Sequence, residues 1–211
     1  MGRNLEPKSK QERREGVNLF LKGEKNTSPK NPMIKRPYPP GMHGPNLKKG
    51  KRQSGYGERL REKQKAKKTY RLLEREFHRY FVKAGKMAGN TSENLIKLLE
   101  TRLDNVIYRL GFADSRDSAR QLVNHGHITV NSKVLGIPSA NVNVGNIIGI
   151  KPSAMVNKYW QDRLPKLAKV ETPGWLSLNA VEFNGKMVSL PAKDDLVSTF
   201  DPTLIIEFYS R

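Results

Sequence analysis

The positive charge of this chain is concentrated in its first ninety residues, and this limits how the chain can fold. Residues 1–90 carry 25 Lys and Arg against 8 Asp and Glu, a net charge of +17, whereas residues 91–211 carry 14 against 12, a net charge of +2. Glycine and proline are also frequent between positions 29 and 57. Such a segment buries too little apolar surface to fold tightly alone, and it repels itself unless a polyanion neutralises it. We therefore predict that residues 1–45 form an extended basic strap that becomes ordered against RNA.

The same charge could instead belong to a solvated, flexible tail or attract the chain to an anionic membrane surface. The motif PYPPGMHG at residues 37–44 favours a specific contact, because its prolines stiffen the chain while Tyr38 and His43 offer rings for stacking on bases. No apolar run has membrane-spanning length and the N-terminus lacks the apolar core of a signal peptide, so we expect a soluble, unexported protein without a membrane partner. The chain contains no cysteine, which excludes disulfides, thiolate-bound zinc and a cysteine nucleophile.

A helical pattern covers residues 56–86, where we predict one long helix. Its first half is charged on almost every face, as expected of a helix that lies on a charged partner. Its second half carries an apolar and aromatic stripe that includes Tyr70, Phe77 and Phe81. Such a stripe could be a stacking platform for RNA, but a buried face is the more usual meaning of this spacing.

A compact module is predicted after Asn90. One helix is expected over residues 90–111 and a second over residues 116–124, followed by strands near residues 128–130, 134–137 and 147–150. Arg102 and Arg109 fall within the apolar arc of the first helix, so each needs a partner. A guanidinium there could reach the rim, pair with an acid such as Asp114 or Asp117, or bind a phosphate; we favour a structural ion pair for at least one.

Residues 99–112 (LETRLDNVIYRLGF) and 119–131 (ARQLVNHGHITVN) resemble the S4 RNA-binding domain. That domain also occurs in pseudouridine synthases, some tRNA synthetases and a heat-shock protein, so alone it implies only RNA binding. Residues 13–17 (RREGV), 40–44 (PGMHG), 60–65 (LREKQK) and 204–211 (LIIEFYSR) resemble bacterial-type S4 ribosomal proteins, in the same order and over nearly the whole chain. The collinear resemblance is much more specific than any single motif.

This resemblance implies an α+β fold in which the S4 module, two helices on a small and mostly antiparallel sheet, is inserted into a helical domain. The expected bounds are 1–45 for the basic extension, 46–97 plus 164–211 for the helical domain, and 98–163 for the module. The implied function is structural: a primary binder of 16S-type ribosomal RNA that nucleates small-subunit assembly at a helix junction of the 5′ domain. It also implies ribosomal protein S5 as a partner, an effect on translational accuracy, and messenger RNA nearby where it enters the subunit. The implied location is the ribosome in the cytoplasm of a bacterium, or in an organelle.

Some members of this family hold zinc through four cysteines in the extension. The corresponding positions here are Ser9, Glu12, Asn26 and Asn31, so no tetrahedral sulfur site can form, and we predict a zinc-free protein without a cofactor. The extension must then be ordered by RNA, by side-chain hydrogen bonds, or by both. His125 and His127 have metal-ligand character, but without a nearby carboxylate we favour hydrogen bonding or RNA contact.

We predict three zones of RNA contact, because Arg and Lys neutralise phosphates and aromatic rings stack on bases. The strap zone contains Arg3, Arg13, Arg14, Lys22, Lys35, Arg36, Tyr38, His43, Lys48, Lys49, Lys51 and Arg52. The basic-helix zone contains Arg59, Arg61, Lys63, Lys65, Lys67 and Lys68. The module zone contains Arg116, Arg120, Gln121, His125 and His127. Two competing functions are an RNA-modifying enzyme with the same module, which the roughly 55 residues after the module are too few to support, and a general DNA-packaging protein.

Overall fold

The computed structural model describes residues 2, 4–46, 54–168, 170–192 and 199–210. The chain forms two compact units: unit 1 comprises Met1–Ile96 with Val197–Arg211, and unit 2 comprises Lys97–Leu196. The fold is α+β, as predicted, since helices dominate unit 1 and an antiparallel sheet lies in unit 2. None of the helices in the described residues has the length and apolar character needed to cross a membrane.

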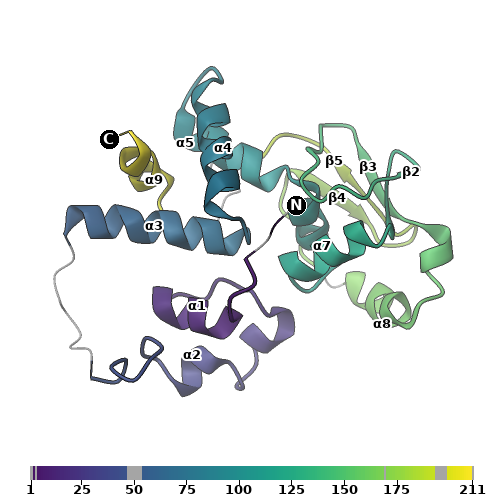
Figure 1. The fold of residues 1–211 in the computed structure, drawn as a ribbon. Coiled ribbons are helices and arrows are strands. Elements are labelled where there is room, and N and C mark those ends of the chain that lie inside the picture. The colour runs from purple at the N-terminus through teal and green to yellow at the C-terminus, as the bar shows by residue number, and fades with distance from the viewer. Residues whose placement is uncertain (1, 3, 47–53, 169, 193–198, 211) are drawn as a thin grey trace. The chain divides into compact units, whose positions relative to one another are not determined.

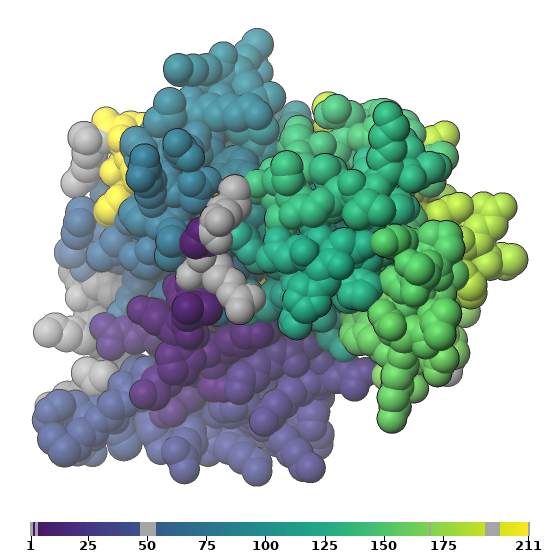
Figure 2. All heavy atoms as spheres, turned by 45° about the vertical axis from the view of Figure 1, so that its right-hand side comes forward, coloured from purple at the N-terminus to yellow at the C-terminus, as the bar shows by residue number. Residues whose placement is uncertain are grey.

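Unit 1 is built around the helix α3 (Figure 1). In chain order its elements are α1 (Lys8–Glu15), η1 (Gly23–Asn26), α2 (Pro32–Lys35), α3 (Gly55–Thr69), α4 (Glu74–Gly85), most of α5 (Thr91–Glu100) and α9 (Pro202–Tyr209). The C-terminal helix α9 lies beside α3, although more than a hundred residues separate them. The segment predicted as an extended strap contains the short helices α1, η1 and α2. In Figure 2 the atoms of residues 4–46, purple to blue-violet, pack together.

The prediction of one helix over residues 56–86 was wrong. The chain turns between α3 and α4, where Arg71 has a left-handed backbone with φ of 57°. The Arg71 side chain is buried and donates from Nη1 to Gln11 Oε1 at 2.7 Å and from Nη2 to the carbonyl of Asn4. This turn brings the end of α3 against the N-terminal segment, a long-range contact that helical periodicity does not reveal.

The predicted helix over residues 90–111 is also two helices, α5 and α6 (Leu103–Arg109). Arg102 interrupts it in an extended conformation and forms an isolated antiparallel bridge with Asn141. The backbone N–H groups of Leu103 and Asp104 donate to the carbonyls of Ala140 and Pro138, at 2.9 and 3.0 Å. A distant loop thus supplies the acceptors that an unbroken helix would have provided.

Unit 2 contains a sheet with strand order β2-β1-β3-β5-β4. Its strands are β1 (Ile128–Val130), β2 (Lys133–Val134), β3 (Ile147–Ile150), β4 (Leu176–Asn179) and β5 (Asn184–Met187), and α7 (Arg116–Asn124), η2 (Pro152–Ala154) and α8 (Lys158–Leu167) complete the unit. The expected domain bounds placed everything after residue 164 with the helical domain. The structure differs, because β5 pairs with β3 of the module and β4 pairs with β5, leaving α9 in unit 1.

The core of unit 2 lies between α6, α7 and one face of this sheet. It contains Trp160, Trp175 and Phe112, each 1% exposed or less. Leu110, which directly follows α6, approaches β5 so closely that a Cβ atom at Gly185 would lie 2.5 Å from its Cδ2. A larger residue at position 185 would therefore require the Leu110 side chain to shift within the core.

Candidate nucleic-acid interface

Arg13 was predicted to bind RNA, but its side chain makes contacts within the chain. Its Nε donates to the carbonyls of Arg36 and Tyr38, both at 3.0 Å, and its guanidinium lies 4.7 Å from the centre of the Tyr38 ring. These contacts fix the loop that contains Pro39 and Pro40 against α1. Arg13 and Tyr38 therefore position the strap, whatever else they contact.

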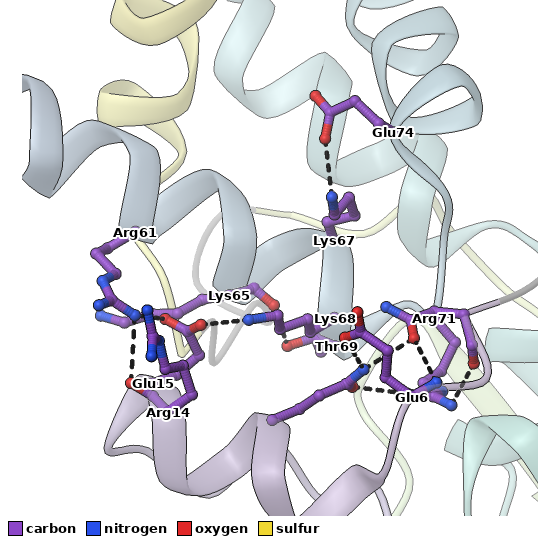
Figure 3. Close-up of polar contacts among 12 residues, drawn as sticks. Glu6, Arg14, Glu15, Arg61, Lys65, Lys67, Lys68, Thr69, Arg71 and Glu74 are labelled. Carbon is purple, nitrogen blue, oxygen red and sulfur yellow. Dashed lines mark hydrogen bonds and ion pairs between the residues drawn. The ribbon is translucent and has the colours of Figure 1, made fainter. Parts of the chain in front are cut away.

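Glu15 joins α1 to α3 through two of the predicted RNA-binding cations. Its carboxylate, only 1% exposed, lies 2.5 Å from Lys68 Nζ and 3.5 Å from Arg61 Nη1, which also donates to the carbonyl of Arg14 at 3.3 Å. Figure 3 shows Lys68 and Arg61 reaching from α3 toward Glu15. A buried carboxylate with two cationic partners holds these helices together, so part of the basic helix faces inward.

The remaining cations of the basic helix also have acidic partners. Lys63 is 6% exposed and lies 2.8 Å from Glu74 Oε1, while Lys67 lies 2.9 Å from Glu74 Oε2. Burial alone would raise the pKa of Glu74, but hydrogen bonds from Lys63, Tyr209 and Lys67 outweigh it and lower this pKa to about 2. The pKa of Tyr209 is raised, by burial and by its hydrogen bond to Glu74. Two further pairs on this helix are Lys65 with Glu62 and Arg59 with Glu207.

A hollow of about 340 Å³ runs along one face of α1. Four residues at helical spacing, Pro7, Lys10, Gln11 and Arg14, form one wall, and Glu6, Pro40 and Lys68 complete it. Lys10 and Arg14 are exposed, lie one turn apart, and make no ion pair or side-chain hydrogen bond within the described residues. Sequence reasoning missed Lys10, although its i, i+4 spacing from Arg14 was a usable signal.

Arg14 also lines a second hollow, of about 380 Å³, between α1 and α3. The other lining residues are Glu15, Pro39, Glu58, Arg61, Glu62 and Lys65. Three carboxylates offset three cations in this second hollow, whereas Glu6 is the single acid beside Lys10, Arg14 and Lys68 in the first. The first hollow is therefore the more attractive of the two for an anion.

Several predicted strap residues make no side-chain hydrogen bond or ion pair within the part of the chain that the structure describes. They are Arg14, Lys22, Lys35, Arg36 and His43. Arg3, Lys48, Lys49, Lys51 and Arg52 lie outside the described residues. The structure thus separates cations with internal partners from cations whose charge is available to a ligand.

The arginines of unit 2 all have partners inside the unit. Arg102 forms a two-point contact with Asp104, at 3.0 and 2.6 Å, and Arg120 Nη1 lies 3.6 Å from the same carboxylate. Arg109 forms a two-point contact with Glu100, at 3.0 and 2.9 Å. The predicted structural ion pair is confirmed for both Arg102 and Arg109, but the expected partners were wrong.

The expected acids Asp114 and Asp117 lie in the turn after α6 and in the first turn of α7, whereas Asp104 and Glu100 flank the unexpected break between α5 and α6. Asp114 instead pairs with Arg163 of α8. Arg120, predicted to contact RNA, is 3% exposed, so its charge is used inside the unit. Arg116 donates to Asn105 Oδ1 at 2.8 Å and lies 4.5 Å from the centre of the Tyr108 ring.

The exposed rim of unit 2 carries Gln121, His125 and His127. The two imidazole rings lie 6.0 Å apart. The pKa of His127 is lowered by burial and then by the neighbouring positive groups His125 and Lys151, which favours a neutral ring that can donate and accept hydrogen bonds. Among the described residues, no three His, Cys, Asp or Glu side chains gather where they could hold a metal ion.

Comparison with known proteins identifies two family models in this chain. The family model described as "Ribosomal protein S4/S9 N-terminal domain" matches residues 3–100, and the model described as "S4 domain" matches residues 101–148. Three similar proteins are named "Small ribosomal subunit protein uS4". Those of Caldicellulosiruptor saccharolyticus and Thermus thermophilus are each 46% identical over 211 residues and cover 100% of both chains. That of Acetivibrio thermocellus is 48% identical over 199 residues and covers 94% of each chain.

Proposed function

This chain belongs to the uS4 family of small ribosomal subunit proteins, and from that premise we propose that it is a primary binder of 16S-type ribosomal RNA. It is a structural, non-enzymatic component of the ribosome. The finer proposal is that it nucleates small-subunit assembly at a helix junction of the 5′ domain. The resemblance of the whole chain to its family supports this, as does the concentration of its charge in residues 1–90.

The observation that carries the RNA-binding proposal is the pair of unpartnered cations, Lys10 and Arg14, in the hollow along α1 within the described part of the chain. A guanidinium and an ammonium one turn apart can both reach phosphate oxygens, and the planar fork of Arg suits two-point contact. We propose that one phosphate of the RNA backbone binds there. Duplex RNA hides its base edges in a deep groove, so such phosphate contacts and the fit to a junction dominate recognition.

The other proposed contacts follow from the same division of cations. In unit 1 they are Lys22, Lys35, Arg36 and His43, and in unit 2 they are Gln121, His125 and His127. Arg116 contacts Asn105 and Tyr108 inside unit 2 and stays a predicted contact. Arg13, Lys63 and Arg120 are proposed to act as positioning residues, because their side chains have internal partners. Arg3, Lys48, Lys49, Lys51 and Arg52, beyond the described residues, stay predicted contacts.

The proposed protein partner is ribosomal protein S5, with an effect of the pair on translational accuracy. We also propose that messenger RNA passes nearby as it enters the subunit, and that the ribosome concerned is cytoplasmic in a bacterium or lies in an organelle. These proposals rest on membership of the family. Crosslink mapping in assembled subunits would test the proposed contacts with ribosomal protein S5 and with messenger RNA.

A filter-binding titration against structured small-subunit RNA tests the central proposal. Neutralising about eight phosphates gives a slope of log affinity against log salt near −6 to −7. A slope near zero, or equally strong competition by duplex DNA, would reject specific ribosomal-RNA binding and favour a general packaging protein. Co-sedimentation with small subunits in a sucrose gradient is the second expected result, and its absence would contradict the assembly role.

A further inference from the structure

The four positions that align with zinc-binding cysteines of some relatives do not form a zinc site here. Glu12 on α1, Asn26 at the end of η1 and Asn31 before α2 are 0%, 3% and 4% exposed, respectively. The amide nitrogens point inward: Asn26 Nδ2 donates to Glu12 Oε1 at 2.6 Å, and Asn31 Nδ2 donates to the carbonyl of Asn26 at 2.7 Å. An N–H donor cannot ligate a cation, and a single carboxylate does not replace four thiolates. The residues present therefore do not fit zinc.

The hydrogen bonds around Glu12 are unevenly shared between its two oxygens. Oε1 accepts from Asn26 Nδ2 and from the backbone N–H of Leu21, at 2.6 and 3.1 Å. Oε2 is buried and has no partner within the described residues. Oε2 is therefore the oxygen of Glu12 that lacks a hydrogen-bond donor in the described structure, and an oxygen that carried a proton would itself donate.

The Asn26 amide also has one buried oxygen without a hydrogen-bond partner in the described structure. Its Nδ2 makes two hydrogen bonds, to Glu12 Oε1 and to Asn18 Oδ1 at 2.8 Å, and so uses both protons. Its Oδ1 is buried and, among the described residues, accepts from no donor. The two unsatisfied atoms thus belong to two groups that are already joined by one hydrogen bond.

The environment of Glu12 offers no counter-charge among the residues that the structure describes. The charged side chains on the elements packed around it are Lys8, Lys10, Arg13, Arg14 and Glu15 on α1, Lys22 before η1, Glu24 and Lys25 on η1, and Lys30, Lys35 and Arg36 around α2. The helix α3 also packs against α1, but its cations Arg61 and Lys68 pair with Glu15 and its Lys65 pairs with Glu62. Glu12 makes no ion pair with any of them in the described structure. A buried carboxylate without a cation carries a large desolvation cost, which a bound proton removes.

We propose that Glu12 and Asn26 form a carboxylic acid–amide pair, in which a proton on Glu12 Oε2 is donated to Asn26 Oδ1. This single additional hydrogen bond satisfies both orphan atoms and closes a two-point contact. The pair connects the segments that a zinc ion connects in some relatives. It links α1 to Leu21, to η1 and, through Asn31, to α2. The basic extension is thereby ordered without zinc and before RNA binds.

The decisive experiment compares Glu12→Gln with Glu12→Ala in the full-length protein. A Gln side chain keeps the acceptor and offers an N–H where the acid offers its O–H, so the E12Q chain should keep its melting temperature and its amide-exchange protection over residues 8–35. The E12A chain should lose the pair, and exchange there should become faster by about ten-fold or more. Glu24→Gln, at an exposed carboxylate of η1, is the control for the change in charge.

Two further measurements separate a proton from a bound cation. The carboxyl ¹³C resonance of Glu12 at pH 7 should have the chemical shift of a protonated acid, and protection should be unchanged by chelator or by added zinc. Loss of protection in E12Q equal to that in E12A, an ionised carboxyl resonance, or loss of protection with chelator would each overturn the proposal. None of these results depends on RNA binding, so they leave the proposed function to be judged separately.

Discussion

Lys68 of α3 and Glu15 of α1 lie 2.5 Å apart, although 53 residues separate them in the sequence. The Glu15 side chain is 1% exposed, and Arg61 approaches its second oxygen. The most basic segment of the chain is therefore assembled around a buried acid. This arrangement explains how a segment with so much positive charge can still contain packed helices.

Replacement of Glu15 by Gln should destabilise the contact between α1 and α3. Lys68 loses its charged partner, and because it is largely buried, the expected loss is about 1–3 kcal/mol of local stability. Hydrogen exchange should become faster in residues 8–15 while α4 stays protected. Equal protection of α1 in wild type and variant would show that the ion pair contributes little to this contact.

Adjacent arginines on α1 should have different roles in RNA binding. Arg14→Ala removes a cation without an internal partner among the described residues, so it should weaken binding to structured RNA and reduce the magnitude of the salt slope by about 1, at an unchanged melting temperature. Arg13→Ala, the matched control, removes contacts to the Arg36 and Tyr38 carbonyls and should loosen the 36–40 loop. The same salt slope for the Arg14 variant and wild type would contradict the phosphate site; Lys10→Ala tests its other half.

Local patterns predicted the second helix of the module and two of its strands, because their signals lie close together in the sequence, whereas the strand expected over 134–137 is only Lys133–Val134. The expected helix over 116–124 and strand over 147–150 coincide with α7 and β3, and Ser115 caps α7 as a hydrogen-bond acceptor for Ser118. The position of β5 next to β3 was not predictable, since nothing local in residues 184–187 specifies a partner in another segment.

The candidate site could be predicted only in part, for the same reason. Whether a cation is available to RNA depends on the acid that faces it, and several of those acids are distant in sequence: 11 residues away for Lys63 with Glu74, and 148 for Arg59 with Glu207. Charge counting indicated residues 1–90 as the candidate segment, and Lys10 could have been added from its spacing. It could not separate the cations that hold the fold from those that are free to bind.

Acid should weaken the attachment of α9 to α3 and α4. The pKa of Glu74 is lowered from its ordinary value of 4.5 to about 2, so the folded state binds this proton less readily than the unfolded chain. The resulting stability is fully present above about pH 4.5 and is lost as the pH falls toward 2. Because Glu74 is 45% exposed, solvent screening limits the effect to about 1 kcal/mol.

Tyr209→Phe isolates the hydroxyl contribution to this network. It removes the 2.6 Å hydrogen bond to Glu74 while keeping the ring that stacks on Phe81, with centroids 4.7 Å apart. We expect a loss of about 1 kcal/mol near neutral pH and a smaller further loss between pH 4.5 and 2 than in wild type. Urea unfolding monitored at several pH values measures both quantities, and Glu74→Gln should flatten the acid dependence further.

Asp104→Asn should be the most damaging single change in unit 2. This carboxylate is the anion for two buried guanidinium groups, Arg102 at 2.6 Å and Arg120 at 3.6 Å, whose side chains are 1% and 4% exposed. Removing the charge takes the Asp104 carboxylate from both buried guanidinium groups, and loss of one member of a buried pair typically costs about 3–5 kcal/mol. Denaturant unfolding should therefore show a large fall in midpoint.

Asp114→Asn is the matched control: Asp114 is 40% exposed and pairs with Arg163, so its loss should cost far less. If the two variants unfold at the same denaturant concentration, the proposed dependence of the S4 module on its buried arginine pair is incorrect, and Arg120 would again become a candidate for direct RNA contact.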